Sequence, residues 1–110
     1  MKYHEIINSD TPVLVDFFTD WYGPCKLLSP ILTEVKNEIG DIVKFVKVDV
    51  YKDQSLATKL EVCSVPSMIL FKNGKQVWKR CGALQKNEII ALINEHTNNE
   101  TESVYRPDFT

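Results

Sequence analysis

The sequence predicts an α/β fold, with one mixed sheet of about four strands flanked by helices. Three observations support this class. Short apolar runs alternate with longer amphipathic stretches, which is the pattern of strands and helices in one layered domain. The first two runs are separated by a helix-length stretch, so their strands should be parallel, whereas the last two are joined by an Asn-Gly pair and should be antiparallel. The 110 residues, 44% hydrophobic and 25% charged, fit a single globular domain.

Four segments are expected to form the strands. Val13–Phe18 (VLVDFF) is almost entirely apolar, as in a strand buried on both faces. Val43–Val48 (VKFVKV) partly alternates and contains β-branched residues, which predicts a strand with one drier face. Ser67–Phe71 (SMILF) is the third apolar run, and the Asn73-Gly74 pair after it predicts a hairpin to Gln76–Cys81.

Three helices are expected between and after these strands. The first ends at Gly40 and carries an apolar stripe of Leu27, Leu28, Ile31, Leu32, Val35 and Ile39. A short second helix begins near Asp53 or Gln54 and carries Leu56, Ala57, Leu60 and Val62. The last helix precedes Thr97 and carries Leu84, Ile89, Ile90, Leu92 and Ile93. We therefore assign residues 1–96 to the domain, and we expect the polar, unpatterned residues 97–110 to form a mobile tail.

Charge and composition argue against several functions. The net charge of −2 gives no basic surface for nucleic acid or for an anionic membrane. No apolar run approaches the ~20 residues that span a bilayer, and the acidic N-terminal segment does not resemble a secretory signal. We therefore expect a cytoplasmic protein, in which three cysteines do not form a disulfide framework. His4 and His96 have no ligand-spaced partners, so neither a metal site nor a cofactor is expected.

Two segments carry a resemblance to a known family. Val13–Pro30 (VLVDFFTDWYGPCKLLSP) is similar to the active-site segment of the thioredoxin family except at Tyr22, where that family has the first cysteine of its WCGPCK motif. Ser64–Lys75 (SVPSMILFKNGK) resembles the segment that carries the family's cis-proline, here Pro66. The resemblance covers about residues 5–96 and implies a thioredoxin fold.

The N-terminus departs from the family pattern. Only fifteen residues precede Asp16, which leaves room for a short helix over Tyr3–Asn8 but hardly for the family's first strand. We therefore expect a four-stranded sheet with Val43–Val48 near one edge.

The resemblance implies a thiol-disulfide oxidoreductase that serves electron transport and cell redox homeostasis. In such a protein the first cysteine sits at the amino end of a helix, where the helix dipole and free N–H groups favour a thiolate that attacks a substrate disulfide. The second cysteine, here Cys25, resolves the mixed disulfide. Tyr22 presents instead a phenol with an intrinsic pKa of ~10, and an oxygen nucleophile takes no part in sulfur exchange. Disulfide reduction is therefore expected to be lost or crippled.

Two further residues are implied to support Cys25. Asp16 interrupts an apolar strand, and a lone carboxylate there is costly without a purpose or a partner. In the family the matching aspartate accepts the proton of the resolving thiol, and the lysine that matches Lys47 pairs with it. The alternative is that Asp16 and Lys47 form only a structural ion pair. Cys63 and Cys81 are expected to be free thiols, with Cys81 a small apolar residue at a strand end, although pairing of either with Cys25 stays open.

The resemblance also implies a substrate groove, formed by Trp21, Gly23, Pro24, Val65, Pro66 and Gly82. Its partners would be proteins with disulfides or extended peptides, together with a thioredoxin reductase if a dithiol form exists. The chain itself would be a monomer or a weak homodimer. Two alternatives to an oxidoreductase scaffold stay open: a non-catalytic module that binds peptides or partner proteins, and a monothiol role for Cys25.

Overall fold

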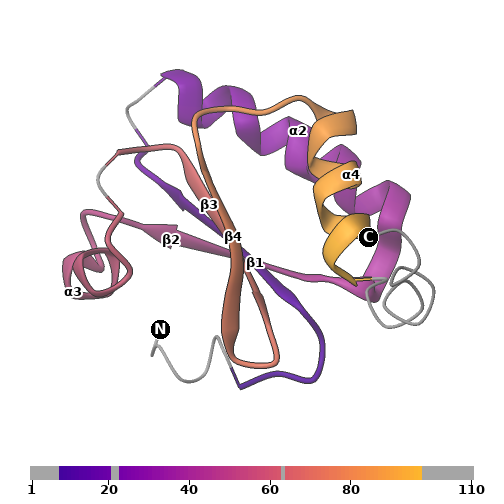
Figure 1. The fold of residues 1–110 in the computed structure, drawn as a ribbon. Helices are drawn as coiled ribbons and strands as arrows, with labels where there is room; N and C mark the ends of the chain where they lie inside the picture. The colour runs from indigo at the N-terminus through magenta and orange to yellow at the C-terminus, as the bar shows by residue number, and fades with distance from the viewer. Residues whose placement is uncertain (1–7, 21–22, 63, 98–110) are drawn as a thin grey trace, which may run out of the picture.

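The computed structural model describes residues 8–20, 23–62 and 64–97, except for the side chain of Pro24 (Figure 1). In this part of the chain the elements follow one another as the α/β pattern predicts. They are β1 (Val13–Phe18), α2 (Gly23–Ile39), a 3₁₀ turn (Gly40–Ile42), β2 (Lys44–Asp49), α3 (Gln54–Lys59), β3 (Ser67–Lys72), β4 (Lys75–Cys81) and α4 (Lys86–Thr97).

The four described strands form one mixed sheet in the order β2-β1-β3-β4. β1 runs parallel to β2, with Asp16 opposite Lys47, and antiparallel to β3. β3 and β4 form an antiparallel hairpin. The parallel first pair, the antiparallel last pair and the edge position of β2 in the described sheet all agree with the sequence prediction.

The sheet separates two hydrophobic cores. One core lies toward α2 and α4 and includes Leu14 of β1, and the other lies toward α3 and includes Val15 of the same strand. In Figure 1, α2 and α4 lie side by side, with α3 on the other side of the strands. The alternate side chains of β1 therefore fill both cores, which explains why its sequence is apolar on both faces.

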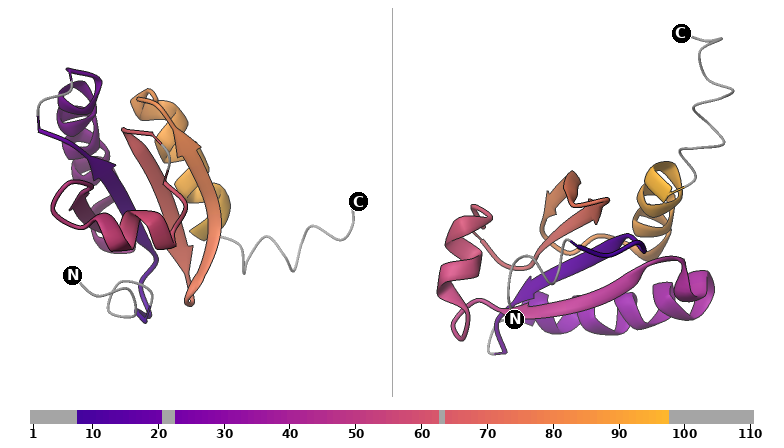
Figure 2. Two further views of the ribbon diagram at one scale, coloured as in Figure 1. Left: turned by 90° about the vertical axis from the view of Figure 1, so that its left-hand side faces the viewer. Right: turned by 90° about the horizontal axis from the view of Figure 1, so that it is seen from below.

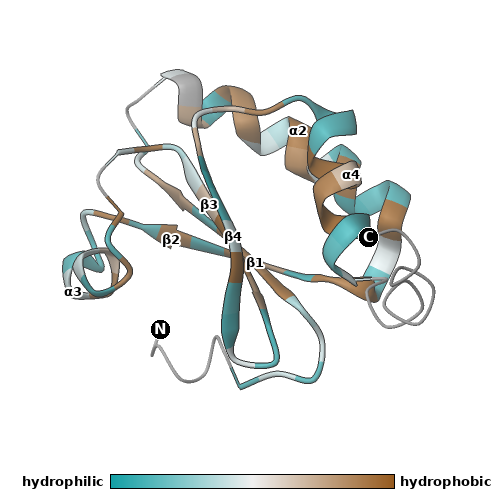
Figure 3. Cartoon of the chain, in the orientation of Figure 1, coloured by the Kyte–Doolittle hydropathy of each residue, from teal (hydrophilic) through white to brown (hydrophobic). Residues whose placement is uncertain are grey.

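The long helix α2 is amphipathic and follows the sheet. Brown and teal alternate along it in Figure 3, and the right-hand view of Figure 2 shows it running along β1 and β2. Leu28, Leu32 and Val35 are buried against the sheet. Leu27, a member of the same predicted stripe, is instead 66% exposed. It precedes Leu28 by about 100° around the helix axis and therefore faces solvent.

Local signals set the start of α3 and the hairpin turn. The Asp53 carboxylate accepts a hydrogen bond from the backbone N–H of Leu56 at 3.4 Å, so Asp53 caps α3, which begins at Gln54. Asn73 and Gly74 have φ values of 54° and 81°, the left-handed pair that a type I′ turn requires. The β3–β4 register then shifts between Leu70 and Phe71, which marks a β-bulge near the turn.

Some expected boundaries differ from those observed. Leu84 precedes α4 and Val62 follows α3, although both side chains pack against the cores. α4 ends at Thr97, one residue inside the range assigned to the tail. The helix expected over Tyr3–Asn8 and the remaining tail residues 98–110 fall almost wholly outside the described residues. No helix in the described ranges combines the length and apolar character needed to cross a bilayer.

Candidate functional site

The segment with the altered motif connects β1 to α2. Trp21, Tyr22 and the side chain of Pro24 lie outside the described residues. Gly23 is the first residue of α2, and a Cβ atom built on it would meet no other atom within 4 Å. Position 22 therefore directly precedes the helix in the sequence.

Cys25 lies in the first turn of α2. Its thiol is free, and the residue is only 5% exposed. It lines a hollow of about 390 Å³ together with Ser29 of the same helix, Asp20 after β1 and Lys47 of β2. The thiol is therefore buried near the carboxyl ends of two parallel strands.

Asp16 lies on β1 in a second hollow, of about 200 Å³. The residue is 3% exposed, and its Oδ1 atom has no hydrogen-bond partner among the described residues. Burial raises the pKa of its carboxyl group to about 6, and the positive charge of Lys47 opposes part of that rise. Ser29 and Lys47 line both this hollow and that of Cys25. The Asp16 carboxyl and the Cys25 thiol therefore occupy adjoining hollows.

Lys47 does not form a close ion pair with Asp16. The two residues are opposite each other on paired strands, but the Lys47 side chain is exposed and its Nζ atom lies 4.5 Å from the centroid of the Phe18 ring. In the described part of the chain no N–O contact within 4.0 Å joins Lys47 to Asp16. The structure therefore shows no close contact between the two charges, and Lys47 acts on Asp16 through its charge at longer range.

The loop before β3 lies next to the end of β4. The Val65–Pro66 peptide bond is cis, Pro66 is buried and Val65 is partly exposed. The backbone N–H of Gly82 donates a hydrogen bond to the carbonyl oxygen of Pro66 at 2.8 Å. Gly82 has a φ of 90°, a left-handed conformation that favours glycine. Three of the residues implied for the groove, Val65, Pro66 and Gly82, are therefore adjacent.

Cys81 ends β4 in the same region. It lies opposite Ser67, whose hydroxyl oxygen is 3.7 Å from Sγ of Cys81 and 2.7 Å from the carbonyl oxygen of Ser64. The Cys81 thiol is free and exposed, and hydrogen bonds from Ser64 and then Ser67 lower its pKa. The expectation of a packed apolar filler is wrong, because the end of this outer strand is open to solvent. Cys25 is also a free thiol, and Cys63 lies outside the described residues.

Comparison with known sequences decides the family. The thioredoxin family model matches residues 1–95. The chain belongs to the thioredoxin family. It is 41% identical over 91 residues to the thioredoxin of Haemophilus influenzae, which covers 83% of this chain and 85% of that relative. It is 49% identical over 87 residues to thioredoxin Y2, chloroplastic, of Arabidopsis thaliana, which covers 78% of this chain and 52% of that relative.

Solved structures agree with this assignment to the thioredoxin family. A point-mutant thioredoxin from Halobacterium salinarum matches with a TM-score of 0.78 and 31% identity, covering 84% of this chain and 80% of that one. The thioredoxin of Malassezia sympodialis matches with a TM-score of 0.77 and 30% identity, covering 86% and 83%. The thioredoxin fold predicted from the sequence is therefore confirmed, and the chain is a member of a family of thiol-disulfide oxidoreductases.

Several polar residues at this thioredoxin-family site were not anticipated from the sequence. Thr19 is 3% exposed, and its hydroxyl group has no hydrogen-bond partner among the described residues. Ser29 lines both hollows, and Ser64 and Ser67 act on Cys81. The two serines are visible in the sequence as a pair that flanks Val65-Pro66, but their contact with Cys81 depends on the pairing of β3 with β4. In the described ranges no three His, Cys, Asp or Glu side chains are grouped to hold a metal ion.

Proposed function

We propose that this chain is a thioredoxin-type disulfide oxidoreductase scaffold whose disulfide reduction is lost or crippled because Tyr22 stands at the attacking position. One observation carries the proposal. α2 begins at Gly23, so position 22 is at the helix start where a thiolate would be stabilised, whereas the thiol on the helix, Cys25, is 5% exposed. The position suited to attack therefore has no sulfur, and the remaining sulfur is buried.

The chemistry of exchange explains why one buried thiol is not enough. A thiolate attacks one sulfur of the client disulfide, which forms a mixed disulfide and releases the other client sulfur as a thiolate. A second thiolate of the same oxidoreductase chain then attacks the sulfur of the first cysteine in that mixed disulfide. This step releases the client sulfur as a thiolate and leaves a disulfide between the two cysteines of the oxidoreductase. In this scheme Asp16 would accept the proton of Cys25 from the adjoining hollow. The positive charge of Lys47 would lower the pKa of the Asp16 carboxyl group. The phenol of Tyr22 supplies no sulfur for the first step.

Family membership implies proteins with disulfides as clients and a thioredoxin reductase as electron donor. For this chain we propose that clients or extended peptides would lie along the rim formed by Trp21, Gly23, Pro24, Val65, Pro66 and Gly82. We also propose a cytoplasmic location, a domain that ends near residue 96, and a monomer or weak homodimer. The hydrogen bond between Gly82 and Pro66 supports the rim, because it fixes two of its loops to each other.

Insulin reduction driven by dithiothreitol tests the proposed loss. The wild-type chain is compared with Tyr22→Cys, and Tyr22→Ser serves as the matched control because it removes the ring without adding sulfur. We expect the wild type and Tyr22→Ser to stay near the uncatalysed rate and Tyr22→Cys to exceed them about tenfold or more. Wild-type turnover within tenfold of Tyr22→Cys would overturn the proposal, and an inactive Tyr22→Cys variant would show that the scaffold has lost more than the first cysteine.

The alternative function is a peptide-binding module without redox chemistry. The observations that favour it are two separate apolar residues near the motif and the proline: Leu27 of α2 is 66% exposed, and Val65 is partly exposed. Sedimentation and chemical-shift mapping with extended peptides would compare the wild type with Tyr22→Ser. If both proteins are strictly monomeric and bind the same peptides equally, Tyr22 has no binding role and this alternative loses its main support.

A further inference from the structure

The hollow beneath α2 contains a polar group that the fold leaves unsatisfied. Asp16 lines this hollow, and Oδ1 of its carboxyl group is buried without a hydrogen-bond partner among the described residues. Buried polar atoms are normally paired, because leaving one unpaired costs about 1–3 kcal/mol. A molecule that brings a donor to this carboxyl group would therefore gain more here than at an ordinary surface.

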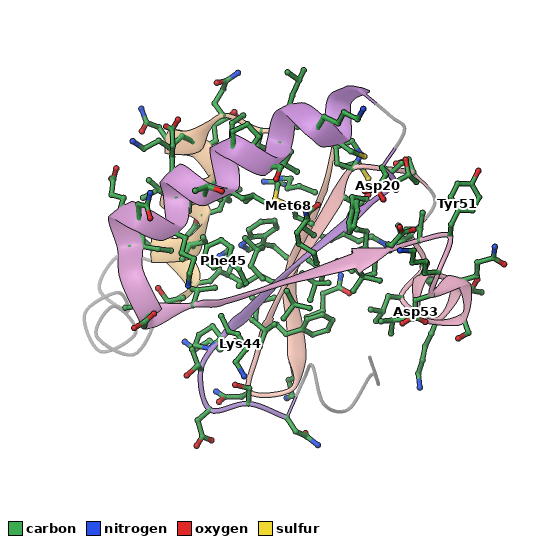
Figure 4. The ribbon with its side chains drawn as sticks, turned by 180° about the vertical axis from the view of Figure 1, so that it is seen from behind. Asp20, Lys44, Phe45, Tyr51, Asp53 and Met68 are labelled. Atoms are coloured by element: carbon green, nitrogen blue, oxygen red, sulfur yellow. The ribbon has the colours of Figure 1, made fainter. Side chains whose placement is uncertain are left out.

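The walls of the hollow are mainly apolar. Leu14 of β1, Leu32 of α2 and Phe45 of β2 line it from three elements. Figure 4 shows Phe45 extending from β2 into the space beneath α2. The hollow measures about 200 Å³, and a dry protein cavity of about 150 Å³ is large enough to bind benzene. The space therefore suits a ligand of one or two fused rings.

The charges around the hollow restrict the ligand further. Lys36 of α2 and Lys47 of β2 line it, with Nζ of Lys36 5.5 Å from the ring centroid of Phe45. From the neighbouring strand β3 the residue opposite Asp16 is Met68, which is uncharged. Lys36 is paired with Asp41, with Nζ 3.9 Å from Oδ1, so an organic cation would be repelled mainly by Lys47. An anion would be repelled by the Asp16 carboxylate. A neutral molecule with an N–H or O–H donor avoids both costs.

We propose that the hollow between α2, β1 and β2 binds a small neutral aromatic molecule, with its ring against Leu32 and Phe45 and its N–H or O–H donor on the carboxyl group of Asp16. Indole has this size and this arrangement of groups. The site goes beyond disulfide exchange, since it requires neither Tyr22 nor a second thiol. Because the hollows of Asp16 and Cys25 adjoin, an occupant would also compete with any proton that passes between these two groups.

The proposed hydrogen bond makes binding depend on pH. A donor stabilises the ionised carboxylate, so bound ligand lowers the pKa of Asp16 from its raised value of about 6. By linkage, affinity rises as pH increases through that value. The charged and titratable groups that face Asp16 are Lys47 from β2 and Lys36 from α2, with the Cys25 thiol in the adjoining hollow.

Two-dimensional ¹H–¹⁵N NMR of the full chain tests the site with indole and with 1-methylindole, which has the same rings but no donor. We expect indole to shift amides of β1, β2 and the middle of α2, and to bind about tenfold more tightly than 1-methylindole at pH ~7.5. The ratio of the two affinities should fall toward one at pH ~4.5, where Asp16 is protonated. Equal affinities at the higher pH, shifts confined to another part of the molecule, or no saturable shift at millimolar indole would each overturn the proposal.

Two variants and a matched control locate the ligand. Leu32→Phe fills the hollow and should weaken indole binding about tenfold or more, whereas Leu27→Phe makes the same change at an exposed position of the same helix and should leave it unchanged. Asp16→Asn should remove the pH dependence. This second variant keeps the test decisive if Leu32→Phe fails to fold, because retained pH dependence in Asp16→Asn would also overturn the proposal.

Discussion

Asp16 is a buried carboxyl group whose ionisation costs free energy in the folded state. Its carboxyl group is buried, lacks a partner for Oδ1 among the described residues, and has no ion pair with Lys47. The folded protein therefore binds a proton at this site more tightly than the unfolded chain, with a pKa of about 6 against 3.8. Both states hold the proton below pH ~4, and the folded state alone holds it between about pH 4 and 6. The stability contributed by this proton is thus fully present below pH ~4 and is lost as pH rises through about 6.

Asp16→Asn should remove this pH-dependent loss. We expect the variant to match the wild type in free energy of unfolding near pH ~4 and to exceed it by roughly 2–3 kcal/mol near pH ~8. Urea denaturation at several pH values measures the difference. Asp10→Asn, at an exposed position before β1, is the control and should follow the wild type throughout. A constant difference between Asp16→Asn and the wild type across the range would contradict the assigned burial cost.

Cys81 should be the more reactive of the two described thiols. It is exposed and its pKa is lowered by hydrogen bonds, whereas Cys25 is buried. We expect iodoacetamide to alkylate Cys81 faster than Cys25 at neutral pH, and Ser67→Ala to slow Cys81 about threefold by raising its pKa. Peptide mapping by mass spectrometry measures each cysteine separately. Faster labelling of Cys25, or an unchanged Cys81 rate in Ser67→Ala, would show that these hydrogen bonds do not control the thiol.

At the scale of elements, the start of α3 is held by the side-chain cap of Asp53. A helix of six residues is too short to be stable by itself, so its first turn must be held by contacts from outside. Asp53→Ala removes the acceptor for the N–H of Leu56 and should lower the free energy of unfolding by about 1 kcal/mol. Asp53→Asn retains an acceptor and should cost only a few tenths. Thermal and urea unfolding would compare them, and equal losses would mean that the cap contributes nothing.

The elements also show what the sequence could and could not predict. β1 was predicted with its observed bounds, because its apolar run is interrupted only by Asp16. β2 begins one residue later than predicted, since Val43 is buried but pairing starts at Lys44. The exposure of Leu27 depends on where the helix axis lies over the sheet, which an apolar stripe alone does not specify.

The site was predictable as a set of positions but not as a set of contacts. The motif segment predicted Cys25 and Asp16, and the family resemblance on the neighbouring strand predicted Lys47. The placement of the Lys47 ammonium over the Phe18 ring depends on a side-chain rotamer. The contact of Cys81 with Ser67 requires the register of two strands, which includes a bulge that the sequence does not signal.

At the scale of the whole molecule, the last described helix, α4, is held to the sheet at its carboxyl end. Nζ of Lys72 donates a hydrogen bond to the carbonyl oxygen of His96 at 2.9 Å, which ties the end of α4 to β3. We therefore expect a chain truncated after Thr97 to keep the free energy of unfolding within about 0.5 kcal/mol of the full chain. Truncation after Glu95 removes His96 and should cost about 1 kcal/mol or more. A comparable loss from both truncations would place residues 98–110 inside the cooperative domain.

The bulge in the β3–β4 hairpin sets which residue of β4 lies opposite Ser67, at the end of the hairpin away from the turn. Beyond the turn, one extra residue of β4 is absorbed between the pairs Phe71–Gln76 and Leu70–Trp78. If the ladder were regular from the turn onward, Ser67 would lie opposite Arg80, and Cys81 would be displaced from it. The bulge, and not the turn alone, thus decides whether Cys81 or Arg80 lies opposite Ser67 beside the proline loop. An insertion or deletion in β4 between the turn and Cys81 would change which β4 residue lies opposite Ser67, although the proline loop itself had not changed.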